Sequence, residues 1–228
     1  MIKDLQKEIR RFTDPIRARN STWFFKTGPG QYGEGDMFLG LNTPQMRSLS
    51  KKYRDLPLSE VQELIKSPYH EERSIAIQIL VLQYSKNPKN IYDFYLKNTK
   101  NINNWDLVDI SAPYIVGNYL LDKPRSVLNQ LAHSNSLWER RIAIISTFAF
   151  IRAGQPKDTL RIAKTLLTDR HDLIHKAVGW MLREVGKRCG EKQLTDFLNA
   201  NIKNMPRTTL RYSIEKFPET KRKFYLSL

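Results

Sequence analysis

A helical pattern of apolar residues repeats along this chain. Apolar residues recur at helical spacing in three segments, residues 72–84 (ERSIAIQILVLQY), 138–152 (WERRIAIISTFAFIR) and 175–187 (HKAVGWMLREVGK). When such segments are aligned, one register position recurs at intervals of 32 to 36 residues. The register residues are Arg73, Asp109, Arg141, Lys176 and Arg211. A period in this range, filled by a pair of helices, is typical of an α-solenoid.

Two repeat classes have about this length. The W-x₂-L-G-x₂-Y pattern of tetratricopeptide repeats does not recur in the sequence, which favours degenerate HEAT-like repeats, although their usual period is about 40 residues. Alternating strand patterns are scarce. We therefore expect an all-α protein, a single HEAT-like repeat domain over residues 1–228, with the second helix of each pair lining a concave face.

Proline and capping residues indicate where several helices begin. The pairs Asp14-Pro15, Thr43-Pro44 and Ser67-Pro68 each place a capping side chain before a proline. Proline is favoured in the first turn of a helix, where its missing N–H costs no hydrogen bond. Each pair predicts a helix start.

The charge of the chain predicts polyanionic partners. Lys and Arg number 38 against 23 Asp and Glu, which gives a formal net charge of +15. Such an excess attracts DNA, RNA or an anionic membrane. Four of the five register residues are basic, so the concave face would be a groove of positive potential about as wide as a duplex. The alternative is that these residues are solvated helix ends.

Several sequence features bear on the compartment. No run of about 18 apolar residues could span a bilayer, and residues 1–20 lack the apolar segment of a secretory signal. The single cysteine, Cys189, excludes an intramolecular disulfide and is typical of a reducing interior. We expect a cytoplasmic protein that makes no membrane contact.

Three motifs suggest cofactor or metal sites, but their context argues against each. Residues 28–33 (GPGQYG) have the G-x-G-x-x-G spacing, yet an aromatic helical segment precedes them where a dinucleotide site requires a strand. His171 and His175 lie one turn apart without a third ligand, so solvated or capping roles are expected. Trp23 and Trp138 are most simply packing aromatics, and Cys189 a packing residue. We expect neither a metal nor an organic cofactor.

Asp109 is the acidic exception among the register residues. A carboxylate in a phosphate-binding groove repels its ligand and must be partly desolvated when DNA docks. Asp109 could simply pair with Arg141 of the neighbouring repeat. However, Trp105 precedes Asp109 by four residues, and Trp180 follows Lys176 by four, so both indoles lie on register faces. Exposed indoles are good platforms for a sugar, a base or a cation.

This combination of residues suits the hydrolysis of an N-glycosidic bond. A purine alkylated at N3 or N7 is cationic and leaves as a neutral base, through a transition state that concentrates positive charge on the deoxyribose. A carboxylate at Asp109 would stabilise that charge and orient water. Indole faces would hold the cationic nucleotide, and Arg141 could bind the flanking phosphate.

The chain resembles bacterial DNA alkylation repair glycosylases of the AlkD type, which are HEAT-like repeat proteins. The resemblance rests on residues 103–109 (NNWDLVD), 137–144 (LWERRIAI) and 176–187 (KAVGWMLREVGK). It implies that Asp109 is the catalytic aspartate and that Trp105, Trp180 and Arg141 complete the catalytic site. It also implies excision of N3- and N7-alkylated purines, such as 3-methyladenine and 7-methylguanine, from double-stranded DNA. We found no family role for the loop from Gly28 to Gly35.

Three functions follow as hypotheses. The first is a monofunctional DNA glycosylase of base excision repair, without lyase activity, that acts as a monomer and needs no obligate protein partner. Its DNA-binding residues would be Arg73, Arg141, Lys176 and Arg211. The second is a non-catalytic scaffold that binds branched or distorted DNA through the same groove. The third is a solenoid that binds an acidic protein.

Overall fold

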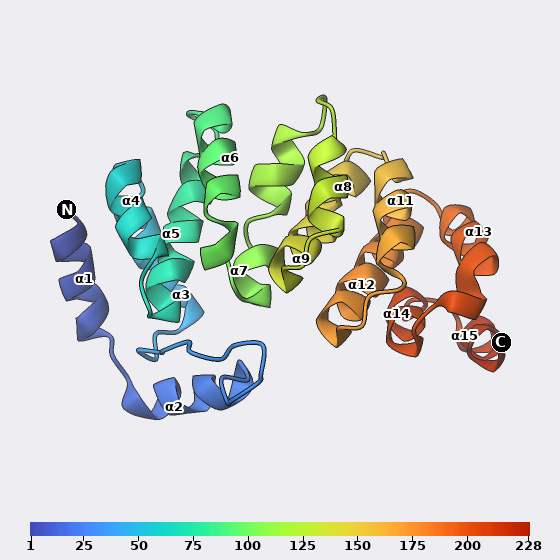
Figure 1. Cartoon of the computed structure of the whole chain (residues 1–228), viewed down its shortest axis with the longest axis horizontal. Coiled ribbons are helices and arrows are strands. Elements are labelled where there is room, and N and C mark those ends of the chain that lie inside the picture. The colour runs from blue at the N-terminus through green and yellow to red at the C-terminus, as the bar shows by residue number, and fades with distance from the viewer. The chain divides into compact units, whose positions relative to one another are not determined.

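The computed structural model describes all residues from 1 to 228 and is all-helical (Figure 1). It contains no β-strand, and a single isolated β-bridge joins Met37 and Tyr69. The chain forms two compact units, Met1–Ser111 (unit 1) and Ala112–Leu228 (unit 2). The all-α prediction is confirmed, whereas a single HEAT-like domain over residues 1–228 stays a prediction.

The helices of each unit follow one another with short connections, except for the long loop of residues 25–42 between α2 and α3. Unit 1 contains α1 (Ile2–Arg11), α2 (Pro15–Phe24), α3 (Thr43–Lys52), α4 (Leu58–Ile65), α5 (His70–Gln83), α6 (Pro88–Lys97), η1 (Thr99–Asn101) and α7 (Trp105–Asp109). Unit 2 contains η2 (Pro113–Gly117), α8 (Ser126–Ala132), α9 (Leu137–Ser146), α10 (Phe148–Arg152), α11 (Lys157–Leu166), α12 (Asp172–Arg188), α13 (Glu191–Asn201), η3 (Ile202–Asn204), α14 (Arg207–Ser213) and α15 (Glu219–Ser227).

Helix pairs of the kind found in α-solenoids recur in both units. Helix α4 packs on α5 in unit 1, while α8 packs on α9 and α11 on α12 in unit 2. The second helices also pack on one another, α5 on α7 in unit 1, and α12 on both α9 and α14 in unit 2. These five helices carry the five register residues. The period found in the sequence therefore corresponds to successive second helices.

Helices α5 and α12 lie at the centre of their units. Helix α5 contacts α3, α4, α6 and α7, and α12 contacts α9, α10, α11, α13 and α14. Helices surrounded in this way bury apolar residues on most sides. In α5, Ile75, Ile77, Ile79 and Leu80 are fully buried. The apolar stretches that revealed the repeat are therefore the cores of the two units.

Side-chain caps set two of the three predicted helix starts. Asp14 caps α2 by accepting hydrogen bonds from the N–H groups of Ile16 and Arg17, and Asn42 caps α3 in a capping box with Gln45. The prediction at Ser67-Pro68 was wrong, because α5 begins only at His70. Backbone bonds to residue 37 hold this segment extended: Met37 N–H donates to the Pro68 carbonyl, and His70 N–H to the Met37 carbonyl.

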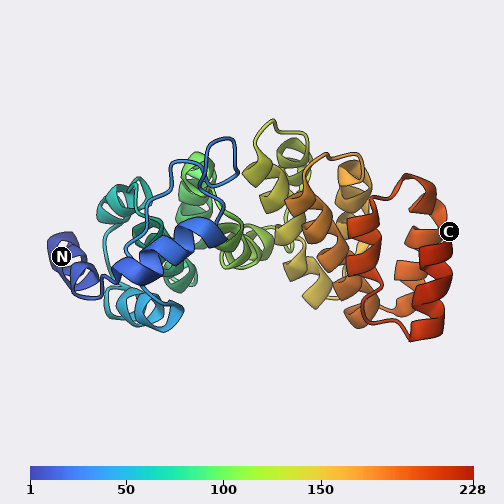
Figure 2. The ribbon, with the colours of Figure 1, turned by 90° about the horizontal axis from the view of Figure 1, so that it is seen from below.

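Helix α2 lies outside the stack of helices in its unit. Figures 1 and 2 show it across one end of that stack, and none of its residues is buried. Trp23 is 77% exposed, with the Lys26 ammonium 5.5 Å from its ring centroid. The prediction that Trp23 is a packing residue was therefore wrong, since no neighbouring helix covers α2.

Candidate functional site

Helix α7 brings the predicted tryptophan and aspartate of unit 1 onto a single helical turn. Trp105 is its first residue and Asp109 its last. The Asn104 side chain caps it, accepting a hydrogen bond from the Trp105 N–H at 2.8 Å. Both Trp105 and Asp109 are half-buried. The spacing in the sequence therefore did identify two residues of one short helix.

Aromatic neighbours fix the indole of Trp105. The Phe25 ring stacks on it with centroids 5.7 Å apart, and the Phe24 ring meets it edge-on at 6.0 Å. Phe24 itself is 54% exposed. The indole is thus supported from the C-terminal end of α2, whereas the sequence had predicted an indole open to solvent.

The negative charge of Asp109 influences the pKa of a buried tyrosine in the same unit. Tyr95 is fully buried, and its hydroxyl shares a 2.9 Å hydrogen bond with the Ser111 hydroxyl. Burial raises the pKa of Tyr95, and the negative charge of Asp109 raises it further, although the bond to Ser111 opposes this. Asp109 therefore adjoins a tyrosine that stays a neutral hydroxyl at physiological pH.

Four charged residues that begin α5 are buried in succession. His70, Glu71, Glu72 and Arg73 are each 2–4% exposed, and buried charges persist in proteins only when they are paired. Glu71 accepts hydrogen bonds from the backbone N–H groups of residues 39 and 40 at 3.0 and 2.7 Å. Glu72 pairs with the Arg10 guanidinium at 2.9 Å. The remaining two, His70 and Arg73, bind the loop between α2 and α3.

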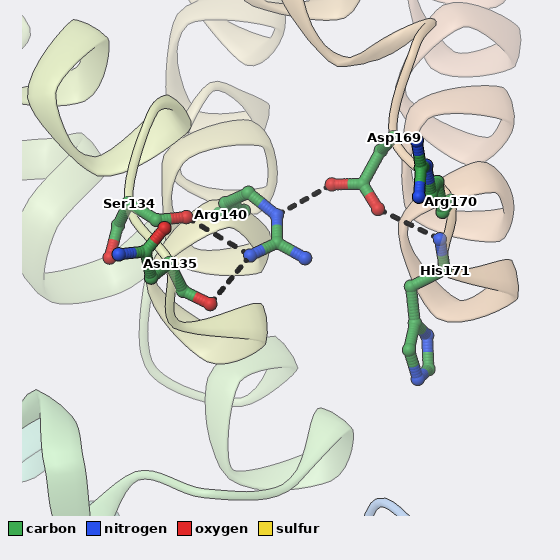
Figure 3. A pocket seen from close by; sticks show the side chains of 6 residues that line it. All are labelled: Ser134, Asn135, Arg140, Asp169, Arg170 and His171. Atoms are coloured by element: carbon green, nitrogen blue, oxygen red, sulfur yellow. Dashed lines mark hydrogen bonds and ion pairs between the residues drawn. The ribbon is translucent and has the colours of Figure 1, made fainter.

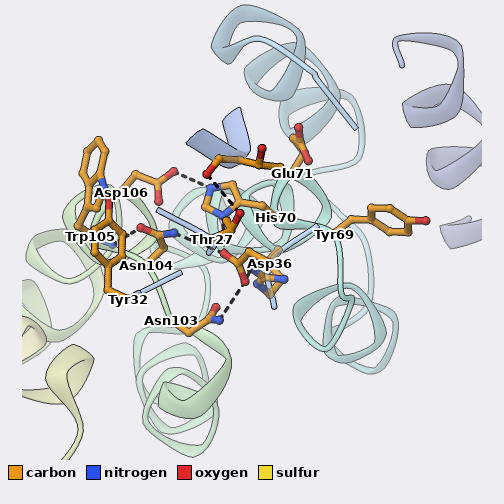
Figure 4. Close-up of polar contacts among 12 residues, drawn as sticks. Thr27, Tyr32, Asp36, Tyr69, His70, Glu71, Asn103, Asn104, Trp105 and Asp106 are labelled. Carbon is orange, nitrogen blue, oxygen red and sulfur yellow. Dashed lines mark hydrogen bonds and ion pairs between the residues drawn. The ribbon is translucent and has the colours of Figure 1, made fainter. Parts of the chain in front are cut away.

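Asp36, in that loop, lies within hydrogen-bond distance of four donor groups from outside the loop (Figure 4). Arg73 Nη2 donates to Oδ1 at 2.7 Å, and Asn103 Nδ2 donates to the same oxygen at 3.1 Å. His70 Nδ1 and Asn104 Nδ2 each lie 3.4 Å from Oδ2. The opposite ring nitrogen of His70, Nε2, lies 2.8 Å from Oδ2 of Asp106. We call Asp36, His70, Arg73 and Asp106 the buried charge cluster.

The buried charge cluster changes the proton affinity of its members. Burial by itself lowers the pKa of His70, but the charge of Asp106 and the hydrogen bonds to Asp106 and Asp36 outweigh it, and the pKa rises to about 9. Burial raises the pKa of Asp36, but the bond from His70 and the charge of Arg73 bring it below its usual value. At neutral pH His70 is therefore protonated and Asp36 ionised.

Arg73 does not form part of an exposed basic surface. Its side chain is 5% exposed, with Nη1 donating to the Ser67 carbonyl at 2.8 Å and Nη2 to Asp36. This corrects the expectation of a cation open to DNA, and the reason is that a buried carboxylate needs a cation beside it. Arg73 and Asp36 also line a cavity of about 220 Å³ together with Glu34, Lys100 and Asn103.

In unit 2 the basic register residues differ in exposure. Arg141 is 5% exposed, and its Nη1 donates to the Leu173 carbonyl at 2.6 Å. The predicted guanidinium open to a phosphate is therefore not found, and a direct contact would require Arg141 to leave this bond. Lys176 is half-buried and pairs with Asp172 at 2.7 Å. Arg211 is exposed, as the prediction of a DNA contact requires.

Trp180 lies on α12, the central helix of unit 2. Its side chain is half-buried, and the Phe148 ring tilts against it with centroids 6.1 Å apart. As with Trp105, a phenylalanine supports the indole and part of the ring stays accessible.

A polar hollow of about 460 Å³ lies beside the N-terminal ends of α9 and α12 in unit 2 (Figure 3). Arg140 crosses it, pairing with Asp169 at 2.5 Å and donating to the Ser134 and Asn135 carbonyls. Arg170 is exposed at the hollow. The donors of Arg140 are thus largely used within the protein, and Arg170 is the cation that the hollow offers to an anionic ligand.

The motifs set aside in the sequence have structural roles. His171 caps α12, its Nδ1 accepting a hydrogen bond from the Leu173 N–H at 3.1 Å, which confirms a capping role. His175 Nε2 bonds to the Asp169 carbonyl at 2.5 Å. Cys189 is half-buried, and burial raises the pKa of its thiol.

None of the helices has the length and apolar character that a membrane span requires.

Sequence reasoning missed Asp36 and His70. Neither belongs to the register, and 34 residues separate them. A weak signal was present, because residues 70–73 (HEER) open a helix that is otherwise apolar and buried. Such a run predicts charged partners elsewhere in the chain but does not say which residues they are.

Comparisons with known proteins place the chain in a family. The model of a family described as DNA alkylation repair enzyme matches residues 5–217. No curated protein matches the sequence. A solved structure described as a predicted DNA alkylation repair enzyme from Enterococcus faecalis is similar in fold, with a TM-score of 0.70 and 15% sequence identity over 91% of this chain and 97% of that one. Because the family model covers most of its sequence, this chain belongs to the DNA alkylation repair enzyme family.

Proposed function

We propose that this protein is a DNA glycosylase of the AlkD type. It would hydrolyse the N-glycosidic bond of cationic N3- or N7-alkylated purines, such as 3-methyladenine and 7-methylguanine, in double-stranded DNA. The observation that carries the proposal is helix α7, which presents a half-buried tryptophan and a half-buried aspartate one turn apart. Membership of the DNA alkylation repair enzyme family supports the same substrate class.

The proposed chemistry needs little from the protein beyond a fixed negative charge. An alkylated purine already carries a positive charge, so the base can leave as a neutral molecule. Positive charge then develops on the deoxyribose, as in the hydrolysis of glycosides. The carboxylate of Asp109 would stabilise that charge and orient the water that attacks C1′. Because the Asp109 carboxylate is half-buried, water would screen its charge less than that of a fully solvated carboxylate.

The indole of Trp105 would hold the damaged nucleotide. A cation near the face of an indole is attracted by the ring quadrupole, by roughly 0.5–2 kcal/mol depending on solvation. Phe24 and Phe25 already fix the ring, so little side-chain entropy would be lost on binding. We keep Trp180 as a second candidate for this role because of the resemblance at residues 176–187 and its supported, half-buried ring.

Exposed cations of unit 2 would bind the DNA backbone. Arg211 and Arg170 are exposed and Lys176 is half-buried, and each could neutralise a phosphate. Every neutralised phosphate steepens the dependence of affinity on salt. Arg141, in contrast, is buried against the Leu173 carbonyl.

Release of free base from methylated DNA tests the proposal. Duplex DNA treated with a methylating agent is incubated with the protein, and released bases are identified chromatographically. We expect 7-methylguanine or 3-methyladenine from the wild-type protein, strongly slowed release from Asp109→Asn, and normal release from Asp122→Asn, a change of an exposed carboxylate in unit 2. Tight DNA binding without any base release would instead favour the non-catalytic scaffold.

A further inference from the structure

His70 connects α7, the helix that carries Trp105 and Asp109, to the loop between α2 and α3. Its Nε2 lies 2.8 Å from Asp106, which belongs to α7, and its Nδ1 lies 3.4 Å from Asp36, which belongs to the loop between α2 and α3. Figure 4 shows the imidazole between the two carboxylates. Asn103 and Asn104, which precede α7, also donate to Asp36. The N-terminal end of α7 is therefore attached to this loop by polar contacts on both sides of Trp105.

The arrangement requires a charged imidazole. A neutral histidine has one N–H donor and one lone pair, so one of the two carboxylates would face a lone pair. An imidazolium donates from both nitrogens, one to each carboxylate. Arg73, on the same helix as His70, remains bound to Asp36, and two further charged residues, Glu34 and Lys100, line the cavity beside Asp36 and Arg73. Asp36 and Asp106 thus face two cations, His70 and Arg73, and of these four side chains only Asp106 is partly exposed.

Helix α7 depends on such contacts for its position. It has only five residues, and a helix of one turn is unstable without tertiary packing. The ring of Phe25 contacts both His70 and Trp105, with its centroid 4.7 Å from that of His70 and 5.7 Å from that of Trp105. A shift at His70 would therefore reach the indole both through Asp106 and through Phe25.

We propose that His70 is a positioning residue, which holds Asp36 and Asp106 together and so fixes α7, with Trp105 and Asp109, in the geometry needed for base excision. The part of this role that concerns excision rests on the proposed function. The loop between α2 and α3, which contains Gly28 and Gly35, thereby gains a role as well, since Asp36 in this loop anchors α7.

Single-turnover kinetics test the positioning role. We expect His70→Gln and Asp106→Asn each to slow excision by about 10- to 100-fold, because small displacements of reacting groups have costs of this size, while DNA affinity stays within about twofold. The double variant should be no slower than the worse single variant, since both changes break the same link. His133→Gln, an exposed histidine of unit 2, is the control. Equal losses of affinity and rate, or multiplicative effects in the double variant, would overturn the proposal.

A pH profile distinguishes positioning from a general loss of folding. In the wild-type protein the excision rate should fall as the pH rises past about 9, where His70 loses its proton. His70→Gln should be slow at every pH and lack this fall. If the variant keeps the same alkaline fall, another group causes it and His70 does not position α7.

A measurement without substrate separates this inference from the proposed function. The indole N–H resonance of Trp105, assigned with Trp105→Phe, should shift with a midpoint near pH 9 in the wild-type protein, and not in His70→Gln. If the wild-type protein shows this shift but releases no base, the link from His70 to α7 is supported and the proposed glycosylase activity is refuted. A resonance that is independent of pH would overturn the positioning role whether or not base is released.

Discussion

The charge on His70 makes the stability of the protein depend on pH in a defined window. The pKa of His70 is about 9 in the folded protein against an ordinary value of 6.5. Each factor of ten in proton affinity corresponds to about 1.4 kcal/mol, so the charged imidazole contributes on the order of 3 kcal/mol to folding. This is a large part of the roughly 5–15 kcal/mol by which proteins are stable.

The sign of the effect follows from proton binding. Below about pH 6.5 the histidine is protonated in both the folded and unfolded chains, and the whole contribution is present. Between about pH 6.5 and pH 9 only the folded chain keeps the proton, so the free energy of unfolding should fall by about 1.4 kcal/mol for each pH unit. Above about pH 9 the contribution is lost.

Urea unfolding followed by circular dichroism measures this fall directly. The experiment compares the wild-type protein with His70→Gln and His133→Gln at several values between pH 6 and pH 9.5. Other groups titrate in this range, so the decisive quantity is the difference in free energy of unfolding between wild-type and variant. That difference should shrink by about 3 kcal/mol for His70→Gln and stay constant for His133→Gln. A constant difference for His70→Gln would refute the assignment of a charged, doubly bonded imidazole.

Four further changes test other parts of the structure. Asp109→Asn should reduce the single-turnover excision rate by about 10² to 10³-fold, as removal of one preorganised electrostatic group does, with the melting temperature and DNA affinity maintained. Arg211→Ala should weaken DNA binding and reduce the slope of log K against log salt by about one, measured by fluorescence anisotropy. Arg141→Ala should remove a buried guanidinium and its hydrogen bond to the Leu173 carbonyl and lower the free energy of unfolding by about 1–3 kcal/mol, whereas a purely DNA-binding arginine would leave it unchanged. Gly40→Ala should destabilise the protein severely in thermal melts, because φ is +88° and the added Cβ would lie 2.1 Å from a backbone carbonyl oxygen.

The position of each candidate residue was easier to predict than its surroundings. Trp105 and Asp109 were paired correctly because four residues make one helical turn, and this spacing holds in any helix. Whether Arg73 and Arg141 are open to a ligand could not be predicted in this way. A basic residue early in a second helix can face solvent or neutralise a buried acceptor, and the partners of these two arginines lie 37 and 32 residues away.

Spacing within a few residues specifies the helical class, the period of the second helices and the turn that carries Trp105 and Asp109, so these could be predicted before the fold was known. Three features depend instead on the tertiary fold: Asp36 meets His70, Arg73 is buried with them, and Phe25 lies between His70 and Trp105. These features could not be predicted because desolvation couples charges that are distant in sequence. Once the backbone places a carboxylate in the interior, whichever cation lies beside it must supply the compensating charge.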